Sequence, residues 1–191
     1  MKIGILAVQG AFEEQKAMLS RWDADCLELR CRADISPSLD GLILPGGEST
    51  VQGKLLRELG MMDPLKERIR SGLPVLGTCA GLILLAEHLS NDPASYFATL
   101  PVTVRRNAYG RQLGSFRTKA AFGSKTIPMT FIRAPYIEEA SPEVEILARV
   151  DGNIVAVRYQ NQLGLSFHPE LDSDPFVHQM FLDCCRERKK A

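Results

Sequence analysis

The fold is decided by the stretch Pro74-Val75-Leu76-Gly77-Thr78-Cys79-Ala80-Gly81-Leu82-Ile83-Leu84-Leu85-Ala86. Its first apolar residues predict a buried strand, and the apolar run from Leu82 to Leu85 predicts a helix that packs on a sheet. Cys79 lies at the corner, with a glycine two positions to either side, because strand and helix must approach closely there. A thiol at the N-terminus of a helix meets the positive end of the helix dipole, which favours negative charge on sulfur.

This stretch alone leaves two interpretations open. Free cysteine is among the most buried residue types, so Cys79 is either a small core residue at a tight turn or the nucleophile of an enzyme. The second interpretation requires a base, a group that orients the base, and a site that stabilises an oxyanion. Only the rest of the chain can supply these three parts.

The composition of the chain disfavours several classes of partner and site. The 191 residues suit one domain over residues 1–191, and 23 basic residues balance 23 acidic ones, which disfavours nucleic acid or an anionic membrane as partner. No apolar run reaches the roughly 20 residues that span a bilayer, and no signal peptide is evident, so a cytoplasmic location is expected. Five cysteines without Cys-x-x-Cys spacing argue against a disulfide framework and against a zinc site.

Strand and helix patterns alternate through the first half of the chain. Strands are expected over 2–8, 25–29, 41–44 and 75–76, and helices over 12–22, 51–59 and 64–70. Shorter segments at 102–105, 112–118, 129–132, 144–150, 154–159 and 163–167 predict further strands, several of them antiparallel. Asp174 is expected to cap a closing helix that ends near Lys189. The expected class is α/β: a single-domain three-layer sandwich whose mostly parallel central sheet carries helices on both faces and an added antiparallel segment.

A histidine supplies the base. His168-Pro169-Glu170 follows the last expected strand, and sites in open parallel sheets form at the carboxyl ends of strands. In extended chain His168 and Glu170 point to the same side, so Glu170 is expected to orient the imidazole. If this strand lies beside the one that carries Cys79, the three side chains form a nucleophile, a base and an orienter. Without Cys79, a His before a Pro is more simply a surface residue.

A glycine-rich loop supplies the oxyanion site. Pro45-Gly46-Gly47-Glu48-Ser49 follows the strand at 41–44, and consecutive glycines let backbone N–H groups turn toward a ligand. Gly46, Gly47 and the N–H of Ala80 are the expected donors. A loop that merely turns the chain is the plainer alternative, and a phosphate-binding P-loop is disfavoured because no Lys-Ser/Thr ends it.

These three segments, in this order, resemble those of the class I, or triad, glutamine amidotransferases. Over nearly the whole chain the sequence is similar to the family of glutaminase subunits of pyridoxal 5'-phosphate synthase. The Gly-x-Cys-x-Gly corner at Cys79 and the His-Pro-Glu segment are shared by the whole class. Two segments point to this family: Pro45-Gly46-Gly47-Glu48-Ser49-Thr50 and Arg106-Asn107-Ala108-Tyr109-Gly110-Arg111-Gln112. The segments that carry the resemblance are residues 4–12, 44–50, 77–86, 106–112, 131–135 and 166–170.

The resemblance implies roles for individual residues. Cys79 is implied as nucleophile, His168 as base and then acid, and Glu170 as orienter, in agreement with the assignment from the residues themselves. The implied contacts of the substrate, L-glutamine, are Gly47, Glu48, Ser49, Arg106, Ile132 and Arg133. Arginine suits the α-carboxylate of glutamine. No metal and no cofactor is implied, and Arg105, beside Arg106, is expected to be an ordinary surface cation.

The resemblance also implies a partner, a synthase subunit that receives ammonia through a protected route. Gln15 departs from the histidine that the family carries there, in a region expected to face this partner, so the departure bears on coupling rather than on the chemistry. Two alternatives stay open: a glutaminase subunit of another synthase, such as imidazole glycerol phosphate synthase, and a non-catalytic regulatory subunit on the same fold. A thiol hydrolase on a similar sheet would not explain the loop at residues 46–49.

Overall fold

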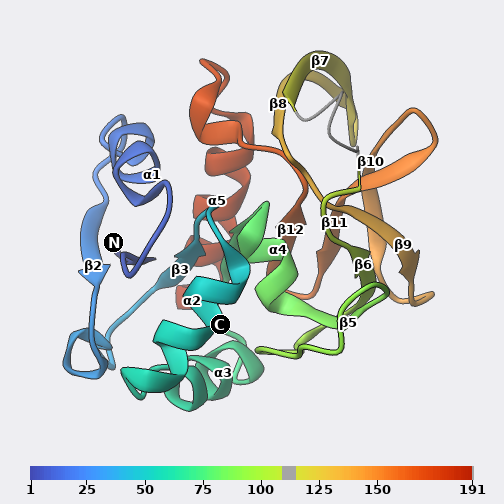
Figure 1. The fold of residues 1–191 in the computed structure, drawn as a ribbon. Coiled ribbons are helices and arrows are strands. Elements are labelled where there is room, and N and C mark those ends of the chain that lie inside the picture. The colour runs from blue at the N-terminus through green and yellow to red at the C-terminus, as the bar shows by residue number, and fades with distance from the viewer. Residues whose placement is uncertain (109–114, 191) are drawn as a thin grey trace.

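A computed structural model describes residues 1–108 and 115–190. Ten strands form one sheet (Figure 1). Nine of them are neighbours in the order β2-β1-β3-β4-β12-β11-β9-β6-β5, and the tenth, β10, pairs with β11. Its strands are β1 (Lys2–Leu6), β2 (Asp25–Leu29), β3 (Gly41–Leu44), β4 (Val75–Thr78), β5 (Ala86–Leu89), β6 (Leu100–Arg105), β9 (Tyr136–Ala140), β10 (Glu145–Val150), β11 (Asn153–Tyr159) and β12 (Gln162–Leu165). A separate antiparallel pair is formed by β7 (Ser115–Phe122) and β8 (Lys125–Ile132).

The parallel half of the sheet is buried on both faces. Strands β2, β1, β3, β4 and β12 run parallel, and every residue of β3, β4 and β12 is buried. Successive side chains of a strand pack into the hydrophobic cores on opposite faces of the sheet: Leu42 and Leu44 pack into one core, and Ile43 packs into the other. This period of two explains why these strands appear in the sequence as continuous apolar runs.

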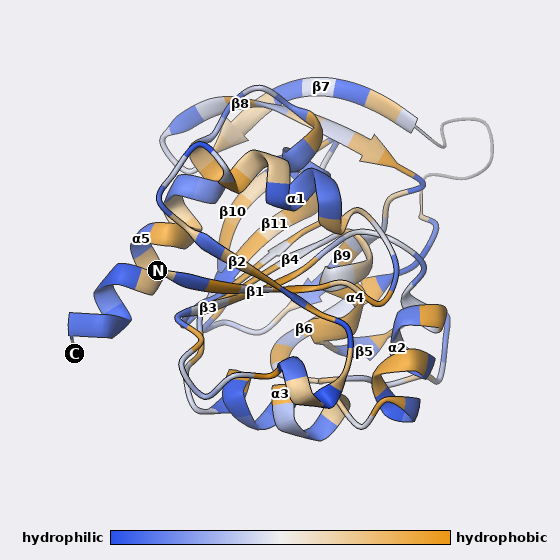
Figure 2. Ribbon diagram, turned by 90° about the vertical axis from the view of Figure 1, so that its left-hand side faces the viewer, coloured by the Kyte–Doolittle hydropathy of each residue, from blue (hydrophilic) through white to orange (hydrophobic). Residues whose placement is uncertain are grey.

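Helices cover both faces of the sheet. On one face lie α1 (Phe12–Leu19), α5 (Phe176–Lys190) and the β7–β8 pair, and on the other lie α2 (Ser49–Glu58), α3 (Met62–Arg70) and α4 (Ala80–Leu85) (Figure 2). Two short 3₁₀ turns, η1 (Arg32–Asp34) and η2 (Pro169–Leu171), complete the elements. Within the described part of the chain, no helix has both the length and the apolar character needed to cross a membrane. The α/β class with a mostly parallel central sheet and added antiparallel strands is confirmed.

Most expected elements are present, and the differences have local causes. The strand at 25–29 and the strand at 41–44 have the predicted bounds. Asp174 Oδ1 accepts a hydrogen bond from Phe176 N (2.9 Å), as expected of the cap of α5. Strands β5 and β9 were not predicted: β5 follows α4 directly and contains the polar residues Glu87 and His88, and β9 carries two glutamates that disfavour a strand. The first residues of the strand expected at 112–118 lie outside the described residues.

Candidate active site

Cys79 stands at a strained corner between β4 and α4. Its backbone has φ 48° and ψ −99°, a conformation that L-residues rarely adopt, and its side chain is almost fully buried. The close approach demands a glycine at position 81, since a Cβ there would lie 2.0 Å from the carbonyl oxygen of Leu44. The corner predicted from the glycine spacing is therefore present, and Cys79 occupies it.

His168 comes from the strand beside β4. Strand β12 pairs in parallel with β4, and Cys79 N donates to Leu165 O (2.7 Å), which places the two strand ends side by side. His168 Nδ1 donates to Glu170 Oε1 (2.7 Å). The prediction that these residues lie in extended chain was wrong: Pro169–Leu171 forms the 3₁₀ turn η2, and within that turn the Glu170 carboxylate reaches the imidazole.

The electrostatics of this group favour a charged imidazole. Burial by itself lowers the pKa of His168, but hydrogen bonds to the Cys79 thiol and to the Glu170 carboxylate outweigh it and raise that pKa to about 10. Because Nδ1 is engaged by Glu170, Nε2 is the nitrogen that faces sulfur. The side chain of Glu170 is fully buried, and its Oε1 lies 2.7 Å from His168 Nδ1. The arrangement fits a thiolate held next to an imidazolium.

The glycine-rich loop lies against this pair. A Cβ at Gly46 would be 2.2 Å from His168 Cε1, so only glycine lets the loop lie on the imidazole ring. Gly46 N, however, donates to Thr78 Oγ1 (3.0 Å), and Gly46 O accepts from Ala11 N (2.9 Å). The expectation that Gly46 supplies an oxyanion donor is therefore corrected: its N–H points into the protein and is already engaged. The N–H groups of Gly47 and Ala80 are the remaining donors of the predicted set.

These parts surround one cavity of about 340 Å³. It is lined by all the expected glutamine contacts together with the predicted nucleophile and base: Gly47, Glu48, Ser49, Arg106, Ile132, Arg133, Cys79 and His168. Arg133 and Asn107, like Cys79, have positive φ although none of them is glycine. Strained backbone gathered around one cavity is typical of a functional site. Arg105 is more than half exposed and pairs with Glu138, as expected of a surface cation.

Some lining residues were missed by sequence reasoning. Gln9, at the carboxyl end of β1, accepts a hydrogen bond from Glu48 N (2.9 Å) through Oε1, and its backbone oxygen accepts from Gln52 Nε2 (2.9 Å). The signal was available, because Gln9 follows an apolar strand at the same edge of the sheet as the predicted site. Gln9 thus fixes the loop that Gly46 and Gly47 belong to.

Gln15 is itself buried, and the expectation that its region faces the partner stays a prediction. Its side chain is fully buried, with Oε1 accepting from His178 Nε2 (2.8 Å) and Nε2 directed at Thr78 Oγ1 (3.4 Å). A residue with no exposed surface cannot itself face a partner. Gln15 instead lies behind the Cys79 corner. It belongs to a buried series of hydrogen bonds that leads from His178 on α5 through Gln15 and Thr78 to Gly46.

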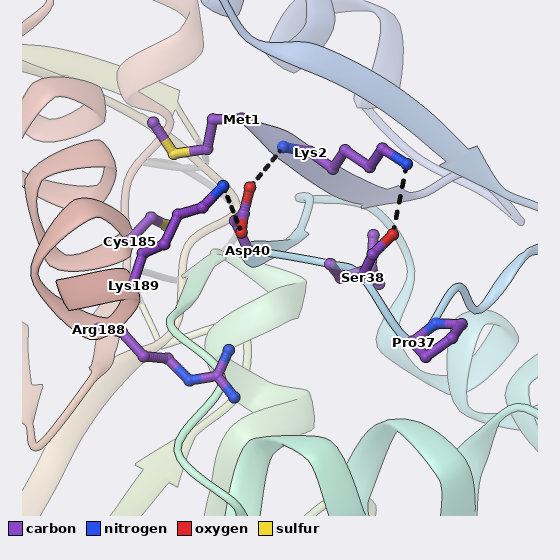
Figure 3. Close-up of a pocket in the computed structure, with 9 residues that line it drawn as sticks. Met1, Lys2, Pro37, Ser38, Asp40, Cys185, Arg188 and Lys189 are labelled. Carbon is purple, nitrogen blue, oxygen red and sulfur yellow. Dashed lines mark hydrogen bonds and ion pairs between the residues drawn. The ribbon is translucent and has the colours of Figure 1, made fainter. Parts of the chain in front are cut away.

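A larger cavity of about 540 Å³ lies at the opposite end of the parallel strands (Figure 3). Asp40, the one carboxylate among its lining residues, accepts from Lys2 N (2.8 Å) and pairs with Lys189 (3.6 Å), and Lys2 Nζ donates to Ser38 Oγ (3.3 Å). Its thiol, Cys185, is buried, which raises its pKa to about 12 and leaves it a poor nucleophile. No base faces that thiol among the lining residues, so the smaller cavity is the better candidate. Across residues 1–108 and 115–190, no three His, Cys, Asp or Glu side chains are grouped to hold a metal ion.

Comparison with known proteins agrees with this geometry. The model of the SNO glutamine amidotransferase family matches residues 5–187. A protein of Desulfitobacterium hafniense strain Y51 named pyridoxal 5'-phosphate synthase subunit PdxT is 64% identical over 192 residues, covering 100% of this chain and 96% of that protein. A protein of the same name from Streptococcus pneumoniae strain CGSP14 is 53% identical, with 100% of both chains covered.

A solved structure described as a glutamine amidotransferase superposes with a TM-score of 0.91 at 41% identity, covering 96% of this chain and 98% of that one. The family model spans nearly the whole chain and includes every residue of the cavity described above. The strained cysteine corner, the histidine and glutamate beside it and the glycine loop thus occur in a sequence whose relatives share its full length. The chain belongs to the SNO glutamine amidotransferase family.

Proposed function

We propose that this chain is the glutaminase subunit of a pyridoxal 5'-phosphate synthase, which hydrolyses L-glutamine to L-glutamate and ammonia and passes the ammonia to a synthase subunit. The relatives that bear this name cover the whole chain at 53–64% identity, which supports the assignment. The observation that carries the chemistry is Cys79 at its strained corner, in contact with an imidazole that Glu170 holds.

The first half of the reaction transfers the acyl group to sulfur. The Cys79 thiolate attacks the side-chain amide carbon of glutamine, and the N–H groups of Gly47 and Ala80 stabilise the oxyanion that forms. The imidazolium of His168 gives its proton to the amide nitrogen as the C–N bond breaks. Ammonia leaves, and the γ-glutamyl group remains on Cys79 as a thioester.

The second half returns the site to its starting state. Neutral His168 takes a proton from water, and the resulting hydroxide attacks the thioester carbonyl. The tetrahedral intermediate expels the Cys79 thiolate, His168 remains as imidazolium, and the new γ-carboxyl group of glutamate loses its proton to solvent as the product leaves. Glu170 keeps the imidazole orientation and supports its positive charge in both halves. The residues present require no metal and no cofactor for these steps.

Substrate recognition follows from the walls of the cavity. The guanidinium groups of Arg106 and Arg133 suit the α-carboxylate, since a guanidinium binds a carboxylate through paired N–H groups. Gly47, Glu48, Ser49 and Ile132 complete the glutamine site in this proposal. In water, ammonia takes up a proton and loses its nucleophilic lone pair, so its use in synthesis calls for a protected route to the synthase subunit.

We further propose that residues 1–191 act as one glutaminase domain and that the reaction takes place in the cytoplasm. The family model, which spans residues 5–187, supports the first statement. The second is supported by the cysteines, since all five are free thiols and a reducing compartment keeps them so.

The test is ammonia release from L-glutamine by the full chain, with and without the synthase subunit. Cys79→Ala is expected to abolish release, to well below 1% of the unsubstituted rate, while leaving the complex with the synthase subunit intact. Cys31→Ala, at an exposed cysteine, is the matched control and should retain full activity. Hydrolysis retained by Cys79→Ala would contradict the assignment. Stimulation by imidazole glycerol phosphate synthase instead of the pyridoxal phosphate enzyme would favour the alternative subunit role.

A further inference from the structure

We propose that Asp92 is a positioning residue that holds the guanidinium of Arg106 ready for the α-carboxylate of glutamine. The inference rests on the proposed glutaminase function and deepens it. Asp92 does not line the cavity; it lies behind Arg106, in the segment between β5 and β6. Its role is therefore exerted through Arg106 and not on the substrate.

The contact between the two side chains is direct. Arg106 Nη1 donates to Asp92 Oδ2, and the Arg106 side chain is only 18% exposed. A guanidinium carries five N–H donors in a rigid plane, so an ion pair through Nη1 leaves donors on the other nitrogens available. Among the described residues no second side chain is paired with this guanidinium, and Arg106 lines the cavity together with Cys79 and His168. The remaining N–H groups of Arg106 can thus donate to a substrate carboxylate.

Asp92 is itself fixed in place. Its Oδ1 accepts a hydrogen bond from Ala94 N (2.9 Å), a local turn in which Pro93 restricts the backbone further. The hydrogen bond from Ala94 and the one from Arg106 lower the pKa of the Asp92 carboxyl, although partial burial opposes them. The carboxylate therefore stays charged at neutral pH and its two oxygens have separate tasks.

The residue before Asp92 secures the backbone of Arg106. Asn91 Oδ1 accepts from Arg106 N (3.1 Å), and Asn91 Nδ2 donates to Arg106 O (3.1 Å). Two consecutive residues thus hold one arginine, the first by its main chain and the second by its side chain. An arginine with both parts fixed has lost its rotamer freedom before glutamine binds, which favours binding.

The same segment also contacts the opposite wall of the cavity. The Tyr96 ring packs on α2, where a Cβ at Gly53 would lie 2.0 Å from it, and the Tyr96 hydroxyl is hydrogen bonded to Ser49. Arg57 donates to Ser95 O (2.6 Å) and lies over the Tyr96 ring. Residues 91–96 therefore connect Arg106 to the wall that carries Ser49, and Asp92 is their link to the guanidinium.

The experiment measures ammonia release by the full chain with its synthase subunit at varied L-glutamine. Asp92→Asn keeps the shape of the side chain but removes its charge, and it is expected to raise KM about tenfold with kcat changed less than twofold. The matched control is Glu138→Gln, which removes the carboxylate from the neighbouring exposed pair, Arg105–Glu138, and should leave KM unchanged. An unchanged or lowered KM in Asp92→Asn would overturn the proposal.

Two further measurements separate positioning from general damage. In an Arg106→Ala background Asp92→Asn should raise KM no further, because its effect runs through Arg106. With 4-aminobutanamide, which lacks the α-carboxylate, Asp92→Asn and the unsubstituted chain should have the same KM. Additive effects in the double variant, or a loss that persists with 4-aminobutanamide, would contradict positioning. If the unsubstituted chain releases no ammonia, the proposed function and this inference fall together; an unchanged KM in an active variant removes this inference alone.

Discussion

At the scale of single residues, the imidazole of His168 depends on two neighbours. The Cys79 thiol and the Glu170 carboxylate each stabilise its charged form, against the cost of burial. The sequence alone does not establish either contact with His168, because Cys79 follows the neighbouring strand β4 and Glu170 contacts the ring from within the turn η2. The charge state of the site is therefore a property of the fold.

Cys79→Ala is expected to lower the pKa of His168, because it removes the hydrogen bond and the negative charge of the sulfur while burial continues to oppose the imidazolium. NMR titration of the His168 ring measures the change. Cys184→Ala, at a buried cysteine on α5, is the control and should leave this titration unaltered. An unchanged titration in Cys79→Ala would show that Cys79 and His168 do not interact.

The same pKa sets an alkaline limit to stability. The folded pKa, about 10, lies above the ordinary histidine value of 6.5, so the folded state binds this proton more tightly. The resulting stabilisation is complete below pH 6.5 and is lost as pH rises toward 10. Denaturant unfolding at pH 7 and pH 9 should show a larger fall for the unsubstituted chain than for His168→Gln.

At the scale of elements, the contact between α4 and β3 leaves no room for a side chain at Gly81. Gly81→Ala would put a Cβ 2.0 Å from the carbonyl oxygen of Leu44, which is backbone and cannot rotate away. Either the start of α4 or the end of β3 must shift, at a cost of about 1–3 kcal/mol in the free energy of unfolding. Urea unfolding measures the cost. Gly123→Ala is a control for the lost space, since nothing lies near a Cβ there, although its φ of 58° adds strain.

Helix α5 carries a second constraint, the buried His178. Burial lowers the pKa of His178 to about 4, and Arg21 adds to the effect. A folded pKa below the unfolded value means that this stability is present above pH 6.5 and is lost as pH falls toward 4, by about 3 kcal/mol in all. Unfolding at pH 7 and pH 4.5 should reveal the loss. His178→Gln should reduce the pH dependence, whereas His88→Gln, at an exposed position, should not.

The elements differ in how far sequence could predict them. Strand β3 and the corner at Cys79 follow from local patterns, an apolar run and a glycine spacing. Strand β9 does not, because Glu138 and Glu139 disfavour a strand and pairing with β6 and β11 holds the segment in one. The engaged N–H of Gly46 was beyond prediction for a similar reason, since its acceptor, Thr78, belongs to another strand. The part that resists prediction is the part decided by non-local contacts.

At the scale of the whole molecule, the three site segments come together because β3, β4 and β12 are neighbours in the sheet. The sequence indicated that each segment follows a strand, and the rule that ligands bind at the carboxyl ends of parallel strands predicted their common edge. The order of the strands was not predictable from the patterns. The alternation of strand and helix patterns predicted the α/β class, and the superposition on a solved glutamine amidotransferase agrees with it.

The position of β12 has a consequence for how the enzyme is made. This strand lies between β4 and β11 in the middle of the sheet, yet it is the last strand in the chain. A ribosome delivers Cys79 long before His168, and the earlier strands have no access to a base until β12 enters the gap beside β4. While residues 80–167 are being made, the nascent chain therefore carries Cys79 without its base, and the proposed hydrolysis of glutamine cannot begin before β12 lies beside β4.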